Sequence, residues 1–259
     1  MAGKALSNLK EKAGIRHYSD GSEKGLIASM HKAGIDISVV SRITTKPEQV
    51  ESIHKWLMGI QRDEIIPMAT WHPDLSVCPG SIEDLKERGF KCIKLHPDYQ
   101  GFYADEKKMF PFYEAAESAG IPILFHAGLD QGLPPPVHAT PERLMTVHRN
   151  FPGLKMVAAH MGGEDNYDDT ERILLGRDIY LDTSFVLRVM PVSILKRFIR
   201  RHSAERILFG SDSPWKDQGE ELAYLQSLPF LHDEEKEKIA GLNAVRLLEL
   251  RENPCSTRS

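Results

Sequence analysis

The stretch Ile207-Leu208-Phe209-Gly210-Ser211-Asp212-Ser213-Pro214 decides the fold of this chain. Its first residues are apolar, as in a buried strand. Gly210 then frees the backbone, and Pro214 prevents the strand from continuing. Asp212 therefore stands at a strand end, where a carboxylate is unfavourable unless a cation meets it. Other stretches repeat this order of apolar strand, polar closing residue, loop and helix, so the pattern predicts a fold that gathers strand ends around one site.

Strand-like and helical segments alternate along most of the chain. The apolar runs with strand character lie at residues 35–40, 65–70, 90–95, 122–125, 154–159 and 179–181 and in the run that starts at 207. Regular alternation indicates a parallel α/β architecture. Because polar residues close nearly every strand, we predict a TIM (β/α)8-type barrel rather than a doubly wound sheet. No linker or low-complexity run divides residues 1–259, so we expect a single domain.

One strand of the predicted barrel is unaccounted for. A closed barrel of this type needs eight strands, and the chain offers seven strand–helix units. Residues 1–33 are predicted to form two helical pieces separated around 14–21, with Gly34 ending the second. Either the first strand is missing and the chain is N-terminally truncated, or residues 1–33 cover the gap irregularly. An open parallel edge is unfavourable, and a second copy of the chain, as in a homo-oligomer, is a candidate for covering it.

The composition excludes several functional classes. The formal net charge is −4, and no Lys/Arg run is longer than two residues, which argues against a nucleic-acid partner. Three cysteines without CxxC spacing are typical of a reducing compartment. Residues 1–14 lack an apolar run, so they indicate neither a signal peptide nor a membrane anchor. We therefore expect a cytoplasmic protein that acts on a small-molecule substrate.

Histidines and aspartates close most of the predicted strands. In chain order, the closing residues are His72, His96, His126, His160, Asp182 and Asp212. Imidazole and carboxylate groups together suit zinc, manganese or iron. Any one of these histidines could instead brace its own loop, and this interpretation is preferred for His72 and His96, which precede prolines. For His126, His160 and Asp212 taken together, a metal-binding or catalytic role is preferred.

Other polar residues near these strand ends are candidates for substrate binding. Lys94 lies two residues before His96, so both face the same side of their strand. A buried ammonium needs a partner or a lowered pKa. For Lys94, pairing with a strand-end aspartate or binding an anionic substrate is preferred over carbamylation. His96 and Tyr99 are further candidates, and Arg188 could hold a substrate carboxylate, although Tyr99 and Arg188 could equally be ordinary core or surface residues.

Several of these runs resemble the amidohydrolase-related family, the branch of the amidohydrolase superfamily that includes aminocarboxymuconate-semialdehyde decarboxylase. The matching runs are 93–97 (IKLHP), 124–128 (LFHAG), 159–163 (AHMGG), 180–184 (YLDTS) and 208–214 (LFGSDSP). The resemblance extends from about residue 25 to residue 250. It implies a metal-dependent barrel enzyme, because family members hydrolyse C–N or C–O bonds, decarboxylate acids or hydrate double bonds.

The resemblance also implies roles for particular residues. His126 would be a metal ligand, and Asp212 a ligand that also accepts a proton from metal-bound water. His160 would orient or deprotonate this water. The family's first strand carries two further ligands as His-x-His, which occurs nowhere in this chain. We therefore expect the native protein to extend upstream of Met1, and we expect weak metal affinity and low activity for the chain as it stands.

Three functional interpretations remain. The leading one is a metal-dependent hydrolase that uses metal-activated water on a small, carboxylate-bearing substrate, with one divalent ion, zinc in preference to manganese. The second is metal-dependent, non-oxidative decarboxylation of an aromatic or unsaturated acid at the same site. The third is a non-catalytic, degenerate barrel. Release of carbon dioxide without hydrolysis of amides, esters or lactones would favour the second, and absence of bound metal would favour the third.

Overall fold

The computed structural model describes residues 17–250, so the first helix predicted near the N-terminus lies outside the described residues. The strands are β1 (Ser38–Val40), β2 (Ile65–Pro67), β3 (Ala69–Thr70), β4 (Ile93–Leu95), β5 (Ile123–Phe125), β6 (Met156–Ala158), β7 (Tyr180–Asp182) and β8 (Ile207–Leu208). All paired strands are parallel, in the orders β1-β2 and β3-β4-β5-β6-β7-β8. Because β2 and β3 are parts of one segment divided at Met68, the strands occupy the seven predicted positions of an α/β barrel.

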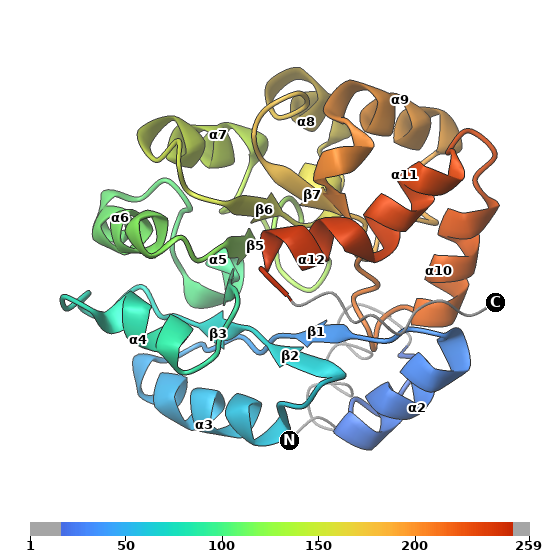
Figure 1. The fold of residues 1–259 in the computed structure, drawn as a ribbon. Coiled ribbons are helices and arrows are strands. Elements are labelled where there is room, and N and C mark those ends of the chain that lie inside the picture. The colour runs from blue at the N-terminus through green and yellow to red at the C-terminus, as the bar shows by residue number, and fades with distance from the viewer. Residues whose placement is uncertain (1–16, 251–259) are drawn as a thin grey trace.

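Helices surround the strands on the outside (Figure 1). They are α2 (Glu23–Ala33), α3 (Val50–Ile60), α4 (Ser81–Glu87), α5 (Pro97–Gln100), α6 (Phe110–Ala119), α7 (Pro141–Asn150), α8 (Tyr167–Ile173), α9 (Val192–His202), α10 (Gln218–Ser227), α11 (Asp233–Glu237) and α12 (Asn243–Leu247). A π-helical turn, Lys238–Leu242, joins the last two. Short 3-10 turns lie at Pro47–Gln49, Lys107–Met109, His160–Gly162 and Ala204–Arg206. As predicted, Gly34 ends α2, with a left-handed φ of 70°.

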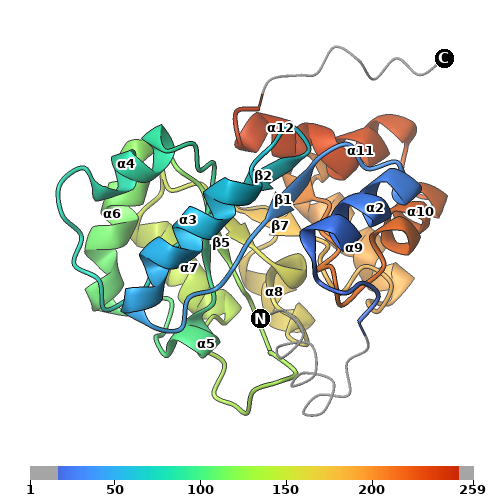
Figure 2. The same cartoon turned by 90° about the horizontal axis from the view of Figure 1, so that it is seen from below.

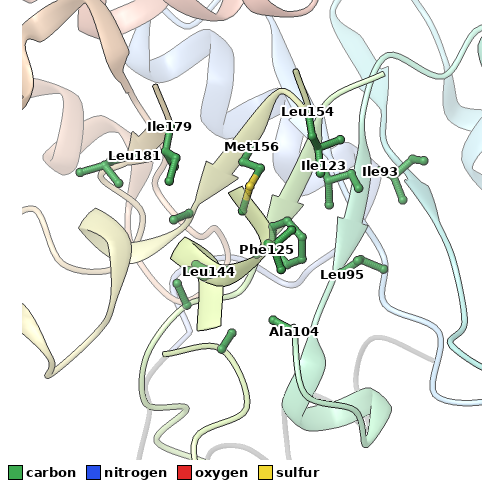
Figure 3. Close-up of a cluster of buried hydrophobic side chains, with 14 of the residues drawn as sticks. Ile93, Leu95, Ala104, Ile123, Phe125, Leu144, Leu154, Met156, Ile179 and Leu181 are labelled. Atoms are coloured by element: carbon green, nitrogen blue, oxygen red, sulfur yellow. The ribbon is translucent and has the colours of Figure 1, made fainter. Parts of the chain in front are cut away.

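The side chains of each strand alternate between two apolar layers. Those facing the helices form the larger cluster, which Figure 3 shows for β4 to β7 and which includes Ile93, Leu95 and Phe125. The opposite faces form a second cluster inside the barrel. Its members are Val39, Met68, Cys92, Leu124, Val157, Tyr180, Leu208, Leu247, Leu248 and Leu250. Lys94 follows Cys92 by two residues, so it faces the barrel interior, on the face where Cys92 lies.

The barrel is not closed between β1 and β8 among residues 17–250. The polar groups on the outer edge of β8 are instead satisfied by the C-terminal helices. Phe209 donates its backbone N–H to the Ile239 carbonyl at 2.8 Å, and the Asn243 amide donates to the Ile207 carbonyl at 2.8 Å. Leu247 and Leu248 of the same region cover the interior cluster from its end. The chain therefore protects one of its open edges itself.

The described part of residues 1–33 packs against α10 and the loop after β8 and forms no strand. Figure 2 shows α2 next to α10, and the two helices pack together. The backbone N–H of Tyr18 donates to the carbonyl of Pro214 at 2.8 Å, which ties this segment to the loop after β8. Whether the first strand is missing or residues 1–33 cover the gap therefore stays a prediction. Within residues 17–250, no helix has the length and apolar character needed to span a bilayer.

Candidate active site and metal centre

The histidines that follow β4, β5 and β6 meet at the carboxyl end of the barrel. The His96 and His126 rings stack, with centroids 4.0 Å apart and an interplanar angle of 9°. The His160 ring meets His126 edge-on at a centroid distance of 4.8 Å. All three side chains are buried. Neighbouring parallel strands end at the same edge, so residues separated by about 30 positions in sequence become direct neighbours.

Hydrogen bonds determine which nitrogen of His160 and of His126 carries a proton. Nδ1 of His160 lies 2.8 Å from the Ser184 carbonyl oxygen, which can only accept, so Nδ1 donates. In the tautomer that carries its proton on Nδ1, His160 offers Nε2 as an acceptor, and this atom lies 3.0 Å from Nδ1 of His126, which then donates. Nε2 of neutral His126 consequently keeps a free lone pair. This buried atom has no hydrogen-bond partner among the described residues.

The surroundings of His126 favour the neutral ring. Burial, together with the neighbouring His96 and His160, holds the pKa of His126 well below its usual range. A neutral imidazole with a buried, unpartnered lone pair is the form that binds a metal ion. His126 therefore suits the ligand role that the sequence predicts for it.

Asp182, at the end of β7, holds His160 in place. Its Oδ1 accepts the backbone N–H of His160 at 3.0 Å and that of Ser184 at 2.9 Å. The Ser184 hydroxyl also donates to Asp182 and lies 3.1 Å from Nδ1 of His160. His160 adopts a left-handed φ of 58°, which is unfavourable for a residue with a side chain. The hydrogen bonds to Asp182 maintain this conformation, which directs the imidazole toward His126.

Lys94 and Asp212 interact electrostatically across the strand ends. Burial lowers the pKa of the Lys94 ammonium, and the charges of Asp182 and Asp212 oppose this change. Desolvation by the surrounding protein raises the pKa of the Asp212 carboxyl, whereas the charge of Lys94 opposes the increase. Asp212 is nevertheless exposed to solvent, which limits the increase. A carboxyl group whose pKa moves toward neutral pH, in contact with solvent, is suited to proton transfer.

His96 and Tyr99, both candidates for substrate binding, lie together beside His126. Nε2 of His96 lies 3.2 Å from Oδ2 of Asp130, and the Tyr99 ring meets the His96 ring edge-on at 4.5 Å. Nδ1 of His96 accepts the backbone N–H of Tyr99 at 3.4 Å, a long contact. Burial raises the pKa of Asp130, but the hydrogen bond from His96 and that from the Gly132 N–H outweigh it, and the net pKa is lowered.

Arg188 and His72 are engaged outside this cluster. Arg188 forms an ion pair with Glu220 and lies 3.9 Å from Glu221. To bind a substrate carboxylate, Arg188 would have to exchange Glu220 for it. His72 accepts the Asp74 backbone N–H on Nδ1 at 3.2 Å, in line with the loop-bracing interpretation.

Glu164 is a site residue that the sequence analysis did not select. It is buried, and its carboxylate accepts the Gln131 amide at 2.8 Å. Burial raises the pKa of Glu164, and the hydrogen bond from Gln131 opposes this increase. The only signal in the sequence is its position four residues after His160. Because two glycines lie between these residues, the direction of the Glu164 side chain could not be predicted from the sequence.

Asp98 is the second residue that was not selected. Its Oδ1 accepts the His138 backbone N–H at 3.0 Å, and its Oδ2 is buried without a hydrogen-bond partner among residues 17–250. The potential ligand atoms of His96, Asp98 and His126 lie within 4.8 Å of one another, whereas Asp212 does not belong to this group. Nitrogen and oxygen donors in this combination suit a divalent transition-metal ion. The signal in the sequence was the His96-Pro97-Asp98 spacing.

A parallel α/β barrel that collects histidines, aspartates and a lysine at its strand ends defines an enzyme scaffold of the amidohydrolase superfamily. The chain belongs to the amidohydrolase family whose model matches residues 81–250. No curated protein matches the chain significantly. The resemblance noted in the sequence is therefore confirmed at the level of the family.

Solved structures similar to this chain share its fold at low sequence identity. A TIM-barrel protein from Bordetella bronchiseptica is 21% identical, with a TM-score of 0.74 over 95% of this chain and 90% of its own. The 5-carboxyvanillate decarboxylase of Sphingomonas paucimobilis is 16% identical, with a TM-score of 0.69 over 87% of this chain and 82% of its own. A dihydroxybenzoic acid decarboxylase from Polaromonas, with bound manganese and 2-nitroresorcinol, is 19% identical, with a TM-score of 0.68 over 88% and 86%.

Proposed function

We propose that this protein is a metal-dependent, non-oxidative decarboxylase of a small aromatic or unsaturated carboxylic acid. The observation that carries the proposal is the buried Lys94 ammonium, which interacts electrostatically with Asp212 and with His126. A buried ammonium there attracts an anionic carboxylate, and Asp212 is a carboxyl group whose pKa is raised. Decarboxylases of hydroxylated aromatic acids among the structural neighbours support this reaction over hydrolysis.

Each residue has a defined task in this reaction. The bond between the carboxylate and its carbon breaks, the electron pair stays on that carbon, and the carbon takes up one proton. Lys94 binds the substrate carboxylate electrostatically. Asp212, in its protonated form, delivers the proton to the carbon, and solvent, to which it is exposed, restores that proton. A divalent ion, zinc or manganese, would be held by His126 and would polarise a substrate oxygen.

Hydrolysis is the second candidate, because imidazole and carboxylate donors also suit a catalytic zinc ion that activates water. In that reaction, His160 would hold the ring of His126 in its metal-binding tautomer through their hydrogen bond. The two reactions differ in their products, so one set of assays separates them.

The test measures carbon dioxide release by the metal-loaded protein. Purified protein with added Zn²⁺ or Mn²⁺ is incubated with a panel of aromatic acids that includes 2,6-dihydroxybenzoate and 5-carboxyvanillate. A parallel panel contains amides, esters and lactones. We expect carbon dioxide from at least one acid, with the release lost in Asp212→Asn. Hydrolysis of the second panel without carbon dioxide release would replace the proposal with a hydrolase, and absence of both activities would favour a non-catalytic barrel.

A further inference from the structure

The donor atoms around His126 point to a specific set of metal ligands, an assignment that rests on the metal-dependent function proposed above. We propose that Asp98 and His126 bind the divalent ion, and that His96, although equally close, does not. Asp98 has no role in the ligand set that the sequence resemblance implies. The proposal therefore adds a ligand from α5, the short helix after β4, and excludes His96, the nearest alternative ligand.

The first support is the pair of unpartnered atoms. Nε2 of His126 and Oδ2 of Asp98 are both buried without hydrogen-bond partners among residues 17–250. The donor atoms of these two residues lie within 4.8 Å of each other. The hydrogen bond to His160 places the proton of neutral His126 on Nδ1, so Nε2 offers only a lone pair. Two buried electron-pair donors that lack partners in one cluster are unfavourable unless a cation binds them.

The second support is that both donors are held in position. The other carboxylate oxygen of Asp98 accepts the His138 backbone N–H at 3.0 Å. Nδ1 of His138 contacts the Pro97 carbonyl at 3.2 Å, which fixes the His138 segment against the turn that carries Asp98. His126 is fixed by His160. Outer hydrogen bonds of this kind orient metal ligands and strengthen their binding.

The ring stack excludes His96 as a partner of His126 on the same ion. A metal ion bound to an imidazole lies in the plane of the ring, along the lone pair of its nitrogen. The planes of the His96 and His126 rings are inclined by only 9°, with centroids 4.0 Å apart. The two planes are therefore nearly parallel and do not intersect near the rings, so one ion cannot lie in both planes. His96 also uses Nε2 on Asp130 and Nδ1 on Tyr99. His96 therefore supports the His126 ring by stacking against it.

The donor chemistry identifies the class of ion. One imidazole nitrogen and one carboxylate oxygen suit zinc or manganese and leave coordination positions for substrate oxygens or water. Calcium and magnesium, which prefer oxygen ligands, are less well matched. The expected ligand is therefore a divalent first-row transition ion.

The test is titration of Zn²⁺ into metal-free protein by isothermal calorimetry, repeated with Mn²⁺. We expect Asp98→Asn and His126→Gln each to weaken Zn²⁺ binding at least about tenfold. His96→Phe keeps an aromatic ring in the stack, and Asp130→Asn changes a carboxylate on the far side of His96. Both should bind Zn²⁺ within about threefold of the unmodified protein. Circular dichroism of each variant confirms that it is folded.

Two results would overturn the assignment: unchanged Zn²⁺ affinity in folded Asp98→Asn, or a loss in His96→Phe as large as that in His126→Gln. The outcome is independent of the proposed reaction. Zn²⁺ binding with the expected variant pattern but without carbon dioxide release would remove the decarboxylase proposal and leave the ligands assigned. Carbon dioxide release together with unchanged Zn²⁺ binding in Asp98→Asn would remove the ligand assignment and leave the decarboxylase proposal in place.

Discussion

Nδ1 of His126 lies 3.0 Å from Nε2 of His160. Through this contact, the residues that follow β6 and β7 influence which nitrogen of His126 carries the proton. The backbone of His160 is bound by the carboxylate of Asp182, and its Nδ1 contacts the Ser184 carbonyl. A chain of hydrogen bonds from β7 therefore sets the protonated nitrogen of His126, and with it the atom that can bind a metal ion.

Replacing His160 should weaken metal binding without removing a ligand. In His160→Phe the acceptor for the His126 Nδ1–H is lost, so the ring is no longer held in one tautomer. We expect Zn²⁺ affinity to fall about 10- to 100-fold. Calorimetric titration measures the effect, and Tyr99→Phe, which removes only a hydroxyl group near His96, is the matched control. Equal affinities in His160→Phe and the control would disprove the dependence.

Asp212→Asn should remove proton delivery. An amide cannot donate a proton as a carboxyl group does, so kcat for carbon dioxide release is expected to fall at least about 100-fold. Zn²⁺ titration of the same variant separates two roles, because a matching loss of affinity would add the metal-ligand role that the sequence resemblance implies. Asp233→Asn, at an exposed helix start, is the control. Substantial turnover by Asp212→Asn would show that another group supplies the proton.

Stability should fall as the pH falls through the range in which His202 would become charged. Nδ1 of His202 accepts the Gly176 N–H at 3.1 Å and Nε2 donates to the Ile179 carbonyl at 2.8 Å, which requires a neutral ring. Burial, opposed by the Ile179 hydrogen bond, lowers its pKa from 6.5 to about 4. The unfolded chain therefore binds a proton more readily below pH 6.5, so this contribution is present above pH 6.5 and is lost toward pH 4.

The expected size of the His202 effect is a decrease of about 2 kcal/mol in the free energy of unfolding between pH 7 and pH 5. Urea denaturation at both pH values measures it. His202→Gln should lower stability at pH 7 and reduce the pH dependence by about this amount, whereas His17→Gln, at an exposed site, should leave it unchanged. An identical pH dependence in the protein and in His202→Gln would refute the assignment.

Gly128 should tolerate no side chain, because the loop after His126 passes directly over a neighbouring backbone. A Cβ atom at Gly128 would lie 2.1 Å from the backbone nitrogen of Glu164, and its φ is +83°. Gly80 has a similar φ of +81° but nothing within 4 Å of such an atom, so it is a matched control. We expect Gly80→Ala to cost about 1 kcal/mol and Gly128→Ala at least about 3 kcal/mol. Equal losses of stability in Gly80→Ala and Gly128→Ala, measured by thermal denaturation, would show that the loop after His126 moves to accommodate the added side chain.

The strand positions and the strand ends were predictable from local sequence. Seven apolar runs, six of them closed by a histidine or an aspartate, located the seven strand positions, because each run encodes its own burial. The two-residue spacing of Lys94 and His96 placed both on one face of their strand, since side chains alternate along a strand, but it did not decide that this face is the inner one. The gap in the barrel was also predictable, because counting strand-like runs requires no knowledge of contacts.

The environment of each site residue was not predictable in the same way. His96 was expected to brace a loop or bind substrate, and only the structure shows its ring stacked on His126. Asp98 and Glu164 were missed because their importance arises from neighbours distant in sequence: His126 for Asp98, and Gln131 for Glu164. Short polar motifs do not reveal which hydrogen-bond partners remain unsatisfied after folding.

The sequence by itself therefore determined the parallel barrel, its open position and the side chains brought to its mouth, because strand periodicity and strand ends are local properties of the chain. Only the tertiary structure decided which nitrogen of His126 is free, which carboxylate faces it and how Asp212 and Lys94 influence each other. These depend on distances of a few ångströms between segments far apart in sequence, and at that range hydrogen bonding and charge set the chemistry of each group.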